Sequence, residues 1–301
     1  IKWCSMERVR QITRVNEAHK LGYIGNNVTV AVMDTGIGTH IDFGQRIRGF
    51  RDYVGDKKIL YDDNGHGTHV SGIIAGSGFA SHGRYRGMAP GAQIFSIKVL
   101  DRMGKGNTRL VVSALKWLIA NYGKMNIRIL NISVGMLASA RKEEQEELLA
   151  AIEAVWDAGI VVVAAAGNNG PKDKSITIPG LCRKIITVGS SDDEEGEVKN
   201  LGLMRGYSGR GPTEACIMKP EVVAPGTAIV SCKRMGNGYE MKSGTSMATP
   251  VVAGAVAVLL SRYPNLKPAE VKLRLYETSV DTGKSKHAQG WGRLDVMRLI
   301  R

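Results

Sequence analysis

The chain has 301 residues, 43% of them hydrophobic, which is enough for one large domain with a substantial core or for two small ones. The formal charge is +13, but the basic residues are scattered and do not alternate with aromatic ones, so no nucleic-acid partner is expected. The most apolar segment, 250–260, is shorter than the roughly 18 residues of a membrane span, and no membrane partner is expected either.

Short apolar runs alternate with helical patterns along the chain. Nearly continuous apolar runs are typical of strands buried on both faces, and they predict strands at 28–32, 94–99, 127–132, 160–163 and 185–188. Helices are expected at 108–122 and at 143–156, where Leu148, Ile152 and Val155 recur at helical spacing. This alternation predicts an α/β fold with a mainly parallel sheet, helices on both faces and right-handed crossovers.

Cysteines and acidic residues offer few metal candidates. Cys4, Cys182, Cys216 and Cys232 are widely spaced and form no CxxC pair, so a zinc site is not expected, and free thiols are favoured over a disulfide. None of them stands in a pattern typical of a cysteine nucleophile. The acidic run at 192–197 is interpreted as a solvated loop, and metal binding is the alternative for its oxygen-rich side chains.

Asp34 ends the first predicted strand, and a turn at Gly36 follows it. Ligands of open α/β sheets collect at the carboxyl ends of strands, where a carboxylate is well placed to orient another group. The alternative is an ordinary turn or cap residue, because aspartate is common in such turns.

His66 stands between Gly65 and Gly67, which allow backbone to approach an imidazole that stays reachable. A small, apolar helix is expected over 70–76, and His69 on it is interpreted as structural. A metal pair of His66 with His69 is disfavoured, because no glutamate stands between them as in HExxH. The remaining histidines lack such surroundings and are also interpreted as structural: His19, His40, His82 and His287.

Ser246 lies among small residues at the start of a long apolar helix. Such a serine can be a simple N-cap. Alternatively, the backbone N–H groups and the positive end of the helix dipole would favour negative charge developing on a substrate oxygen beside a nucleophile. A serine hydroxyl needs a base to take its proton, histidine titrates near neutrality, and a carboxylate fixes the imidazole tautomer. The order Asp34, His66, Ser246 therefore predicts nucleophilic catalysis by serine.

The segments 64–69 and 244–248, together with the block around Asp34, resemble the signature blocks of the subtilisin-like serine proteases, and the resemblance covers about 27–295. The stretches 61–67 and 86–90 are similar to the intracellular or AprX-like bacterial branch. The resemblance implies a three-layer fold with a seven-stranded sheet, and one catalytic domain over 1–301 with 1–26 as an N-terminal extension packing on it.

The resemblance also implies roles for individual residues. Ser246 would be the nucleophile, His66 the base and then the acid, and Asp34 the group that orients His66. Asn168, in the segment 164–168, would donate its side-chain N–H to the oxyanion beside the backbone N–H of Ser246. Outside this family context, Asn168 is also compatible with an ordinary turn in the sequence Gly-Asn-Asn-Gly.

An extended peptide would pair with two segments of the cleft. By resemblance, Ser133, Val134 and Gly135 lie on one side and Lys105, Gly106 and Asn107 on the other, although both glycines also suit ordinary turns. Thr177 falls where relatives line the base of the main specificity pocket and would make that pocket shallower. No acidic cluster lines the pocket, so cutting after paired basic residues is not favoured.

The expected function is a serine endopeptidase of broad specificity that acts on proteins or peptides at neutral to alkaline pH. A processing protease with few substrates and a non-catalytic binding protein on the same fold are the alternatives. No organic cofactor is expected. Calcium is left open, although the segment 77–86, where relatives carry a calcium loop, is basic and lacks carboxylates. The absence of a secretory signal favours a cytoplasmic location over secretion after removal of a leading segment, and the oligomeric state is left open.

Overall fold

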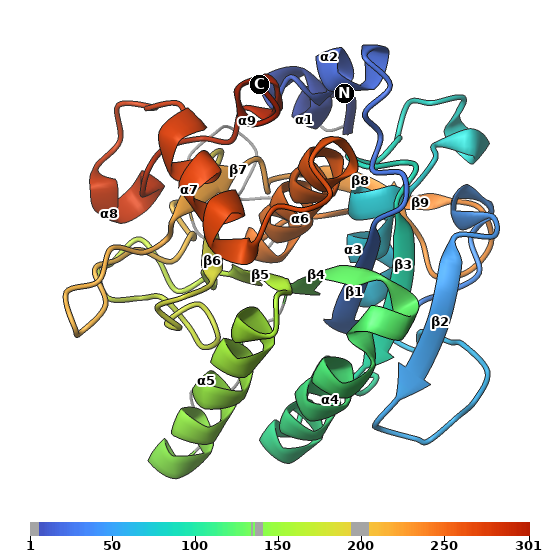
Figure 1. Ribbon diagram of the computed structural model, residues 1–301, viewed down its shortest axis with the longest axis horizontal. Helices are drawn as coiled ribbons and strands as arrows, with labels where there is room; N and C mark the ends of the chain where they lie inside the picture. Colours follow the sequence, from blue (N-terminus) through green and yellow to red (C-terminus); the bar gives the residue numbers. More distant parts are fainter. Residues whose placement is uncertain (1–5, 134, 136–140, 194–204) are drawn as a thin grey trace.

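The centre of the molecule is a parallel sheet (Figure 1) in a computed structural model that describes residues 6–133, 135, 141–193 and 205–301. The sheet has seven strands in the order β2-β3-β1-β4-β5-β6-β7, and every pair of neighbours is parallel. Their bounds are β1 Thr29–Asp34, β2 Ile47–Asp52, β3 Gln93–Lys98, β4 Ile127–Ile132, β5 Val161–Ala165, β6 Ile186–Ser190 and β7 Val222–Ala224.

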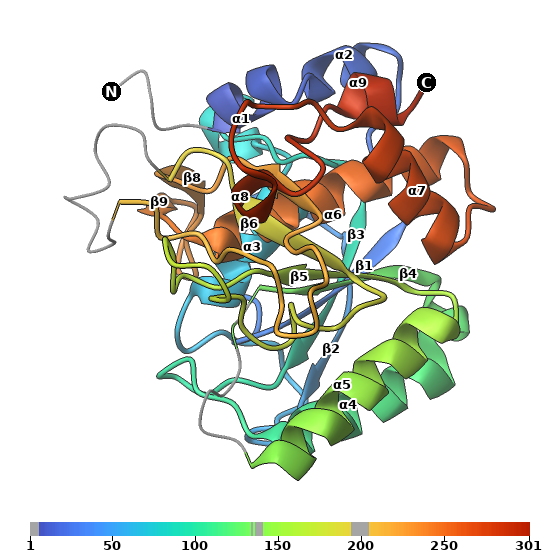
Figure 2. The same cartoon turned by 90° about the vertical axis from the view of Figure 1, so that its left-hand side faces the viewer.

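Helices cover both faces of this sheet. On one face, α3 (His66–Ala75) packs against α6 (Thr245–Arg262), and α6 lies across β4, β5 and β6. On the other face, α4 (Thr108–Asn121) packs against α5 (Lys142–Asp157), and the two run side by side in both views (Figures 1 and 2). The predicted three-layer α/β fold with a seven-stranded sheet is therefore confirmed.

Most predicted elements are present, with shifted ends. The predicted helix at 70–76 begins four residues earlier, at His66, and the helix after Ser246 begins at Thr245. The sequence analysis missed β2 and β7. β2 is an edge strand whose side chains are mostly half-exposed, and β7 has only three residues, so neither shows a long apolar run.

The remaining elements surround the sheet. A two-stranded antiparallel hairpin, β8 (Ile229–Cys232) and β9 (Tyr239–Lys242), lies against α3. The other elements are α1 Met6–Ile12, α2 Val15–Lys20, α7 Pro268–Thr278, α8 Lys286–Gln289, α9 Val296–Leu299 and the 3₁₀ turns η1 Ile41–Phe43, η2 Phe79–Ser81 and η3 Tyr122–Met125.

The two N-terminal helices, α1 and α2, lie beside α9 near the C-terminus (Figure 1). The side chains of Met6, Val9, Val15 and Ala18 are fully buried and belong to the hydrophobic core. The guanidinium of Arg14 forms an ion pair with Asp295 at 3.1 Å. The N-terminal helices therefore contribute side chains to the hydrophobic core that they share with the rest of the molecule.

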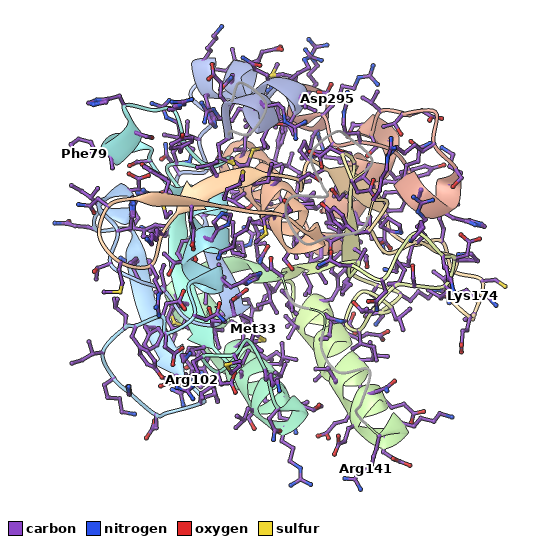
Figure 3. All side chains as sticks on the ribbon, turned by 180° about the vertical axis from the view of Figure 1, so that it is seen from behind. Met33, Phe79, Arg102, Arg141, Lys174 and Asp295 are labelled. Carbon is purple, nitrogen blue, oxygen red and sulfur yellow. The ribbon has the colours of Figure 1, made fainter. Side chains whose placement is uncertain are left out.

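The helix α6 is long and apolar enough to span a membrane by length and composition, but 83% of its most apolar window is buried inside the molecule. It is the central core helix, and its apolar residues on all sides are explained by that burial. Figure 3 shows side chains filling the space between the layers, with Met33 of β1 inside and Arg141 at the edge before α5.

Three of the four cysteines, Cys182, Cys216 and Cys232, are free thiols, and Cys4 lies outside the described residues. The interpretation of the acidic run as a solvated loop is wrong for its first two residues. Asp192 is buried and accepts hydrogen bonds from Gly226 N and Thr227 N at 2.8 and 3.0 Å. Asp193 is buried as well, whereas 194–197 lie outside the described residues.

Candidate active site

Asp34 is the last residue of β1, in the middle of the sheet, and its side chain is fully buried. Its carboxylate faces Nδ1 of His66, at 2.8 Å from Oδ1 and 2.9 Å from Oδ2. Oδ1 also accepts the backbone N–H of Thr35 at 2.7 Å. The site thus lies at the carboxyl end of a central strand, as the sequence predicts.

His66 is the first residue of α3, and the loop before it is held by the side chain of Asp62. This carboxylate accepts hydrogen bonds from Gly65 N at 2.7 Å and from the hydroxyls of Thr35 and Thr68 at 2.9 and 2.6 Å. Gly67 is required for close approach, because a Cβ there would lie 2.2 Å from a backbone oxygen of the Asp34 turn. The predicted reason for the glycines around His66 is confirmed at this position.

The pKa of His66 is raised above its ordinary value. Burial opposes the charged imidazolium, but the charge of Asp34 and its hydrogen bond to Nδ1 outweigh this effect. Lys242, on β9, lowers the pKa of His66, and Asp62 raises it. Asp34 holds the ring of His66 in place. Because the side chain remains 23% exposed, the ring is still accessible from the active-site pocket.

Ser246 is the second residue of α6, and the helix follows Gly244, whose φ of 143° suits a residue without a side chain. Ser246, His66 and Asn168 line the same open pocket of about 420 Å³. The structure therefore brings together Asp34 at the carboxyl end of β1, His66 at the start of α3 and Ser246 at the start of α6. Asn168 lies beside them. These residues lie far apart in the sequence.

The amide of Asn168 is oriented by the start of α6. Its Oδ1 accepts hydrogen bonds from the backbone N–H and the hydroxyl of Thr245, at 2.9 and 3.1 Å. Because the backbone N–H is always a donor, these bonds fix Oδ1 on that side and leave Nδ2 on the other. Nδ2 lies 3.2 Å from the position of a Cβ on Gly244, beside Ser246.

The first predicted substrate-binding segment, 105–107, forms a turn before α4. Asn107 caps α4 by accepting the N–H of Arg109 at 2.9 Å, and Gly106 forms an antiparallel bridge with Leu100. In the same turn, the backbone oxygen of Lys105 accepts the N–H of Asp101 at 2.9 Å. The segment 105–107 thus has a defined turn structure of its own.

On the opposite segment, the side chain of Ser133 is fully buried and accepts a hydrogen bond from Asn131 Nδ2 at 2.8 Å, so it turns away from solvent. Gly135 is exposed, and Val134 lies outside the described residues. The hydroxyl of Thr177 lies 2.9 Å and 2.4 Å from the Cβ positions of Gly135 and Gly167. The structure therefore places Thr177 beside Gly135 and Gly167.

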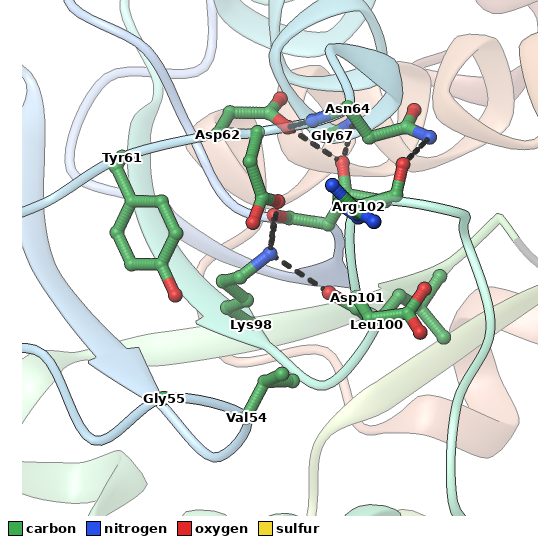
Figure 4. A network of polar contacts seen from close by, with 12 residues as sticks. Val54, Gly55, Tyr61, Asp62, Asn64, Gly67, Lys98, Leu100, Asp101 and Arg102 are labelled. Carbon is green, nitrogen blue, oxygen red and sulfur yellow. Dashed lines mark hydrogen bonds and ion pairs between the residues drawn. The ribbon is translucent and has the colours of Figure 1, made fainter.

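Lys98, at the end of β3, is a residue that the sequence analysis missed (Figure 4). Its fully buried ammonium donates hydrogen bonds to Thr35 O at 2.6 Å, Asp63 Oδ1 at 2.6 Å and Leu100 O at 2.8 Å. It thereby joins the turn after Asp34, the loop before His66 and the start of the 101–107 turn. The sequence signal for this role is that Lys98 is the one charged residue of β3.

His69 is structural, as expected. Its buried Nε2 lies 3.1 Å from both Ile229 O and Glu240 O, so an N–H there holds β8 and β9 against α3. Burial and the charges of Lys242 and His66 lower the pKa of His69 to about 3, which keeps the ring neutral. The predicted structural role of His19 agrees with its contact to Met88 O at 2.8 Å.

One buried group within the described ranges has metal-ligating side chains close together, namely His40, Asp42 and Cys232. Both ring nitrogens of His40 are already used, Nδ1 by Asp42 N at 3.1 Å and Nε2 by Gly238 O at 2.9 Å. Asp42 accepts the hydroxyl of Tyr239 at 2.8 Å. This donor set is therefore satisfied within the protein and does not fit a metal ion.

The segment 77–86 does not fit calcium either. The buried guanidinium of Arg10 lies against its carbonyl oxygens, with Nη1 at 2.6 Å from Arg86 O and Nη2 at 3.3 Å from Gly83 O. Burial and the charge of Arg86 lower the pKa of Arg10 to about 10, so it stays charged near neutral pH. A side-chain cation thus occupies the position beside these carbonyl groups.

Comparisons with known proteins identify relatives over most of the chain. A family model described as the subtilase family, Peptidase_S8, matches residues 25–292. Serine protease AprX of Bacillus subtilis is 42% identical over 286 residues, which are 89% of this chain and 64% of that protein. The chain thus spans less than two thirds of this relative.

Other relatives are covered almost completely. Subtilisin DY of Bacillus licheniformis is 33% identical over 95% of both proteins. Among solved structures, a cold adapted subtilisin-like serine proteinase matches with a TM-score of 0.73 at 29% identity, covering 91% of this chain and 90% of that one. Sphericase matches with a TM-score of 0.76 at 28% identity, covering 90% and 92%.

Proposed function

The chain belongs to the subtilase family of serine peptidases, and on this premise we propose that it hydrolyses peptide bonds of proteins through an acyl-enzyme on Ser246. One observation carries the proposal. The buried carboxylate of Asp34 holds Nδ1 of His66 at 2.8 Å, and His66 shares a pocket with Ser246 and Asn168. This is the arrangement that activates a serine hydroxyl.

Each residue has one task in the proposed reaction. His66 takes the proton of the Ser246 hydroxyl while Oγ attacks the peptide carbonyl carbon, and Asp34 stabilises the imidazolium. The backbone N–H of Ser246 and Nδ2 of Asn168 donate to the oxyanion. His66 then protonates the leaving amine, and the peptide C–N bond breaks. Water, activated by His66, attacks the acyl group and releases Ser246.

We further propose that the substrate binds as an extended peptide that pairs through its main chain with the segments 105–107 and 133–135. Thr177 would limit the depth of the main pocket, because its hydroxyl lies close to Gly135 and Gly167. We propose broad specificity within these limits. A processing protease with few substrates is the rival function, and casein distinguishes the two because such an enzyme would leave casein intact.

The proposed reaction needs no organic cofactor, because its base, acid, nucleophile and oxyanion donors are all side chains or backbone of this chain. Calcium at the segment 77–86 is not part of the proposal, since Arg10 lies against its carbonyl groups.

The test compares the wild type with Ser246→Ala on casein and on a panel of peptide nitroanilides. We expect activity in the wild type and in Ser285→Ala, a matched control at an exposed serine before α8, and none in Ser246→Ala. Activity that survives in Ser246→Ala would contradict the assigned nucleophile. Folded wild type that cleaves none of these substrates would contradict broad specificity and favour the processing enzyme.

A further inference from the structure

One wall of the active-site pocket carries a cation. Lys242, the last residue of β9, lines this pocket together with His66 and Ser246. Its side chain is 29% exposed. A partly desolvated ammonium beside a reaction centre interacts with charged ligands more strongly than one in open solvent.

Among the described residues, Lys242 has one charged partner. Its Nζ forms an ion pair with Glu240 Oε1 at 3.1 Å, and that oxygen lies 3.4 Å from the Cβ position of Gly65, directly before His66. The side chain of Arg234 lies equally close to Gly65, with Cδ at 3.4 Å, and its Nη1 donates to Asp63 O at 2.7 Å. The ion pair of Lys242 with Glu240 and the side chain of Arg234 thus both lie beside the residue that precedes His66.

The pair with Glu240 leaves Lys242 able to bind a second carboxylate. An ammonium has three N–H donors, and the side chain of Glu240 is itself 30% exposed, so neither partner is enclosed by the other. Two apolar side chains complete this wall, Met241, which is 45% exposed, and Met247. A substrate side chain with a short apolar stem and a terminal carboxylate is complementary to this wall.

The position of this pocket relative to the substrate follows from its lining. None of the described residues proposed above to bind the substrate, in 105–107, at 133 and 135, or at 177, lines this pocket. It is instead bounded by His66, which must protonate the leaving amine, and by the β9–α6 junction that precedes Ser246. The pocket therefore lies beyond Ser246, where the leaving half of the substrate departs.

We propose that Lys242 is a specificity-determining residue that favours substrates with glutamate directly after the scissile bond. This inference rests on the proposed function, because it assigns one subsite of that reaction. The carboxylate of the substrate bonds to the Lys242 ammonium in exchange with Glu240, and its methylene groups contact Met241. Substrates with lysine at this position meet the Lys242 ammonium and are disfavoured by like charge.

The test uses three internally quenched peptides that differ only in the residue after the scissile bond, which is Glu, Gln or Lys. We expect kcat/KM to be about fivefold higher for Glu than for Gln at low salt, which is the size of effect that a partly exposed ion pair produces. This ratio should fall toward one in about 1 M salt, because salt screens the ion pair. Lys242→Gln should abolish the difference and Lys242→Glu should reverse it. Lys142→Gln, at an exposed lysine of α5, should keep the wild-type ratio.

Each outcome separates the two proposals. Cleavage of all three peptides at equal rates, or a Glu preference that persists in Lys242→Gln, overturns the role of Lys242 and leaves the proposed function standing. Cleavage of the Glu peptide after its glutamate instead of before it, mapped by mass spectrometry of the products, overturns the assignment to the leaving side. Cleavage of none, with no labelling of Ser246 by a fluorophosphonate, overturns the proposed function and this inference with it.

A pH profile gives a second readout that does not depend on the substrate. Three charged groups act on His66: Asp34 from β1 and Asp62 from the loop before α3 raise its pKa, and Lys242 from β9 lowers it. Removal of the Lys242 charge should therefore move the acidic limb of kcat/KM to higher pH with every peptide. An unchanged limb in Lys242→Gln would show that the ammonium does not act at this site.

Discussion

Two lysines are fully buried beside the same sheet, and they hold different parts of the molecule together. Lys98 binds two backbone carbonyl groups and the carboxylate of Asp63, whose side chain is 41% exposed. Lys219 instead bonds both oxygens of Glu221, whose side chain is only 3% exposed, at 2.8 and 2.9 Å. Lys98 thus depends mainly on main-chain carbonyl groups, whereas Lys219 depends mainly on a buried carboxylate, with Ile185 O and the Thr187 hydroxyl as further acceptors.

The difference teaches what each buried charge constrains. The partners of Lys98 belong to the turn after Asp34, the loop before His66 and the start of the 101–107 turn, so its position affects the reacting groups. The partners of Lys219 belong to β6, β7 and their approaches, and Glu221 is also bound by Lys272 of α7 at 2.9 Å. We therefore expect Lys98 to matter for catalysis and Lys219 for stability.

The largest effect should come from Asp34→Asn, within the region that Lys98 holds. The amide cannot stabilise the imidazolium, and kcat should fall by about 10⁴-fold, the loss known for this change in a catalytic triad. Because the charge of Asp34 raises the pKa of His66, the acidic limb of the residual activity should move to lower pH. A pH series of kcat/KM measures both. A limb that stays in place would contradict the assigned pair.

The next effect should appear in Lys219→Met. This change leaves Glu221 buried with one cation fewer, and it should lower the free energy of unfolding by about 3 kcal/mol, the low end for a broken buried pair because Lys272 remains. Denaturant unfolding measures the loss, with the exposed pair member Lys58→Met as a control. Activity at 25 °C should stay within about twofold of wild type. A large loss of activity in a folded Lys219→Met variant would contradict the expectation that Lys219 matters for stability and not for catalysis.

Lys98→Met should have the opposite profile. Without the ammonium, Thr35 O and Leu100 O lose a donor and the half-exposed Asp63 turns to water, so the turn after Asp34 shifts. A misplacement of roughly 1 Å costs about 10²-fold in rate, which is the expected loss in kcat/KM per titrated active site. Lys98→Arg, which keeps the charge, should recover part of it. Wild-type kcat/KM in Lys98→Met, combined with a large loss of stability, would mean that both lysines are structural.

The smallest effect should come from Arg10→Met, a third buried cation far from the reacting groups. It leaves the carbonyl groups of Gly83 and Arg86 without this donor and should cost about 1–2 kcal/mol of stability, while kcat stays unchanged. Thermal unfolding measures the loss, and Arg14→Met, whose guanidinium is partly exposed, should cost less. A drop in kcat would indicate that the N-terminal helices also influence the cleft.

The sequence by itself determined the local parts of this protein. The apolar runs predict β1, β3, β4, β5 and β6, and helical spacing predicts α4 and α5, because burial on both faces or on one stripe leaves a pattern within a few residues. The small residues around Asp34, His66 and Ser246 marked the candidate site, because close backbone approach excludes side chains at neighbouring positions. Asn168 was assigned through the family resemblance.

Only the tertiary structure decided which charges meet. Nothing local to Lys98 or Arg10 predicts their distant partners, which lie 63 residues away from Lys98 and 76 residues away from Arg10. Asp192 was expected in solvent, yet backbone N–H groups from 226 and 227 surround it. Hydrophobic periodicity records which side of an element is buried, but the partner of a buried polar group depends on the loops that the fold brings to it.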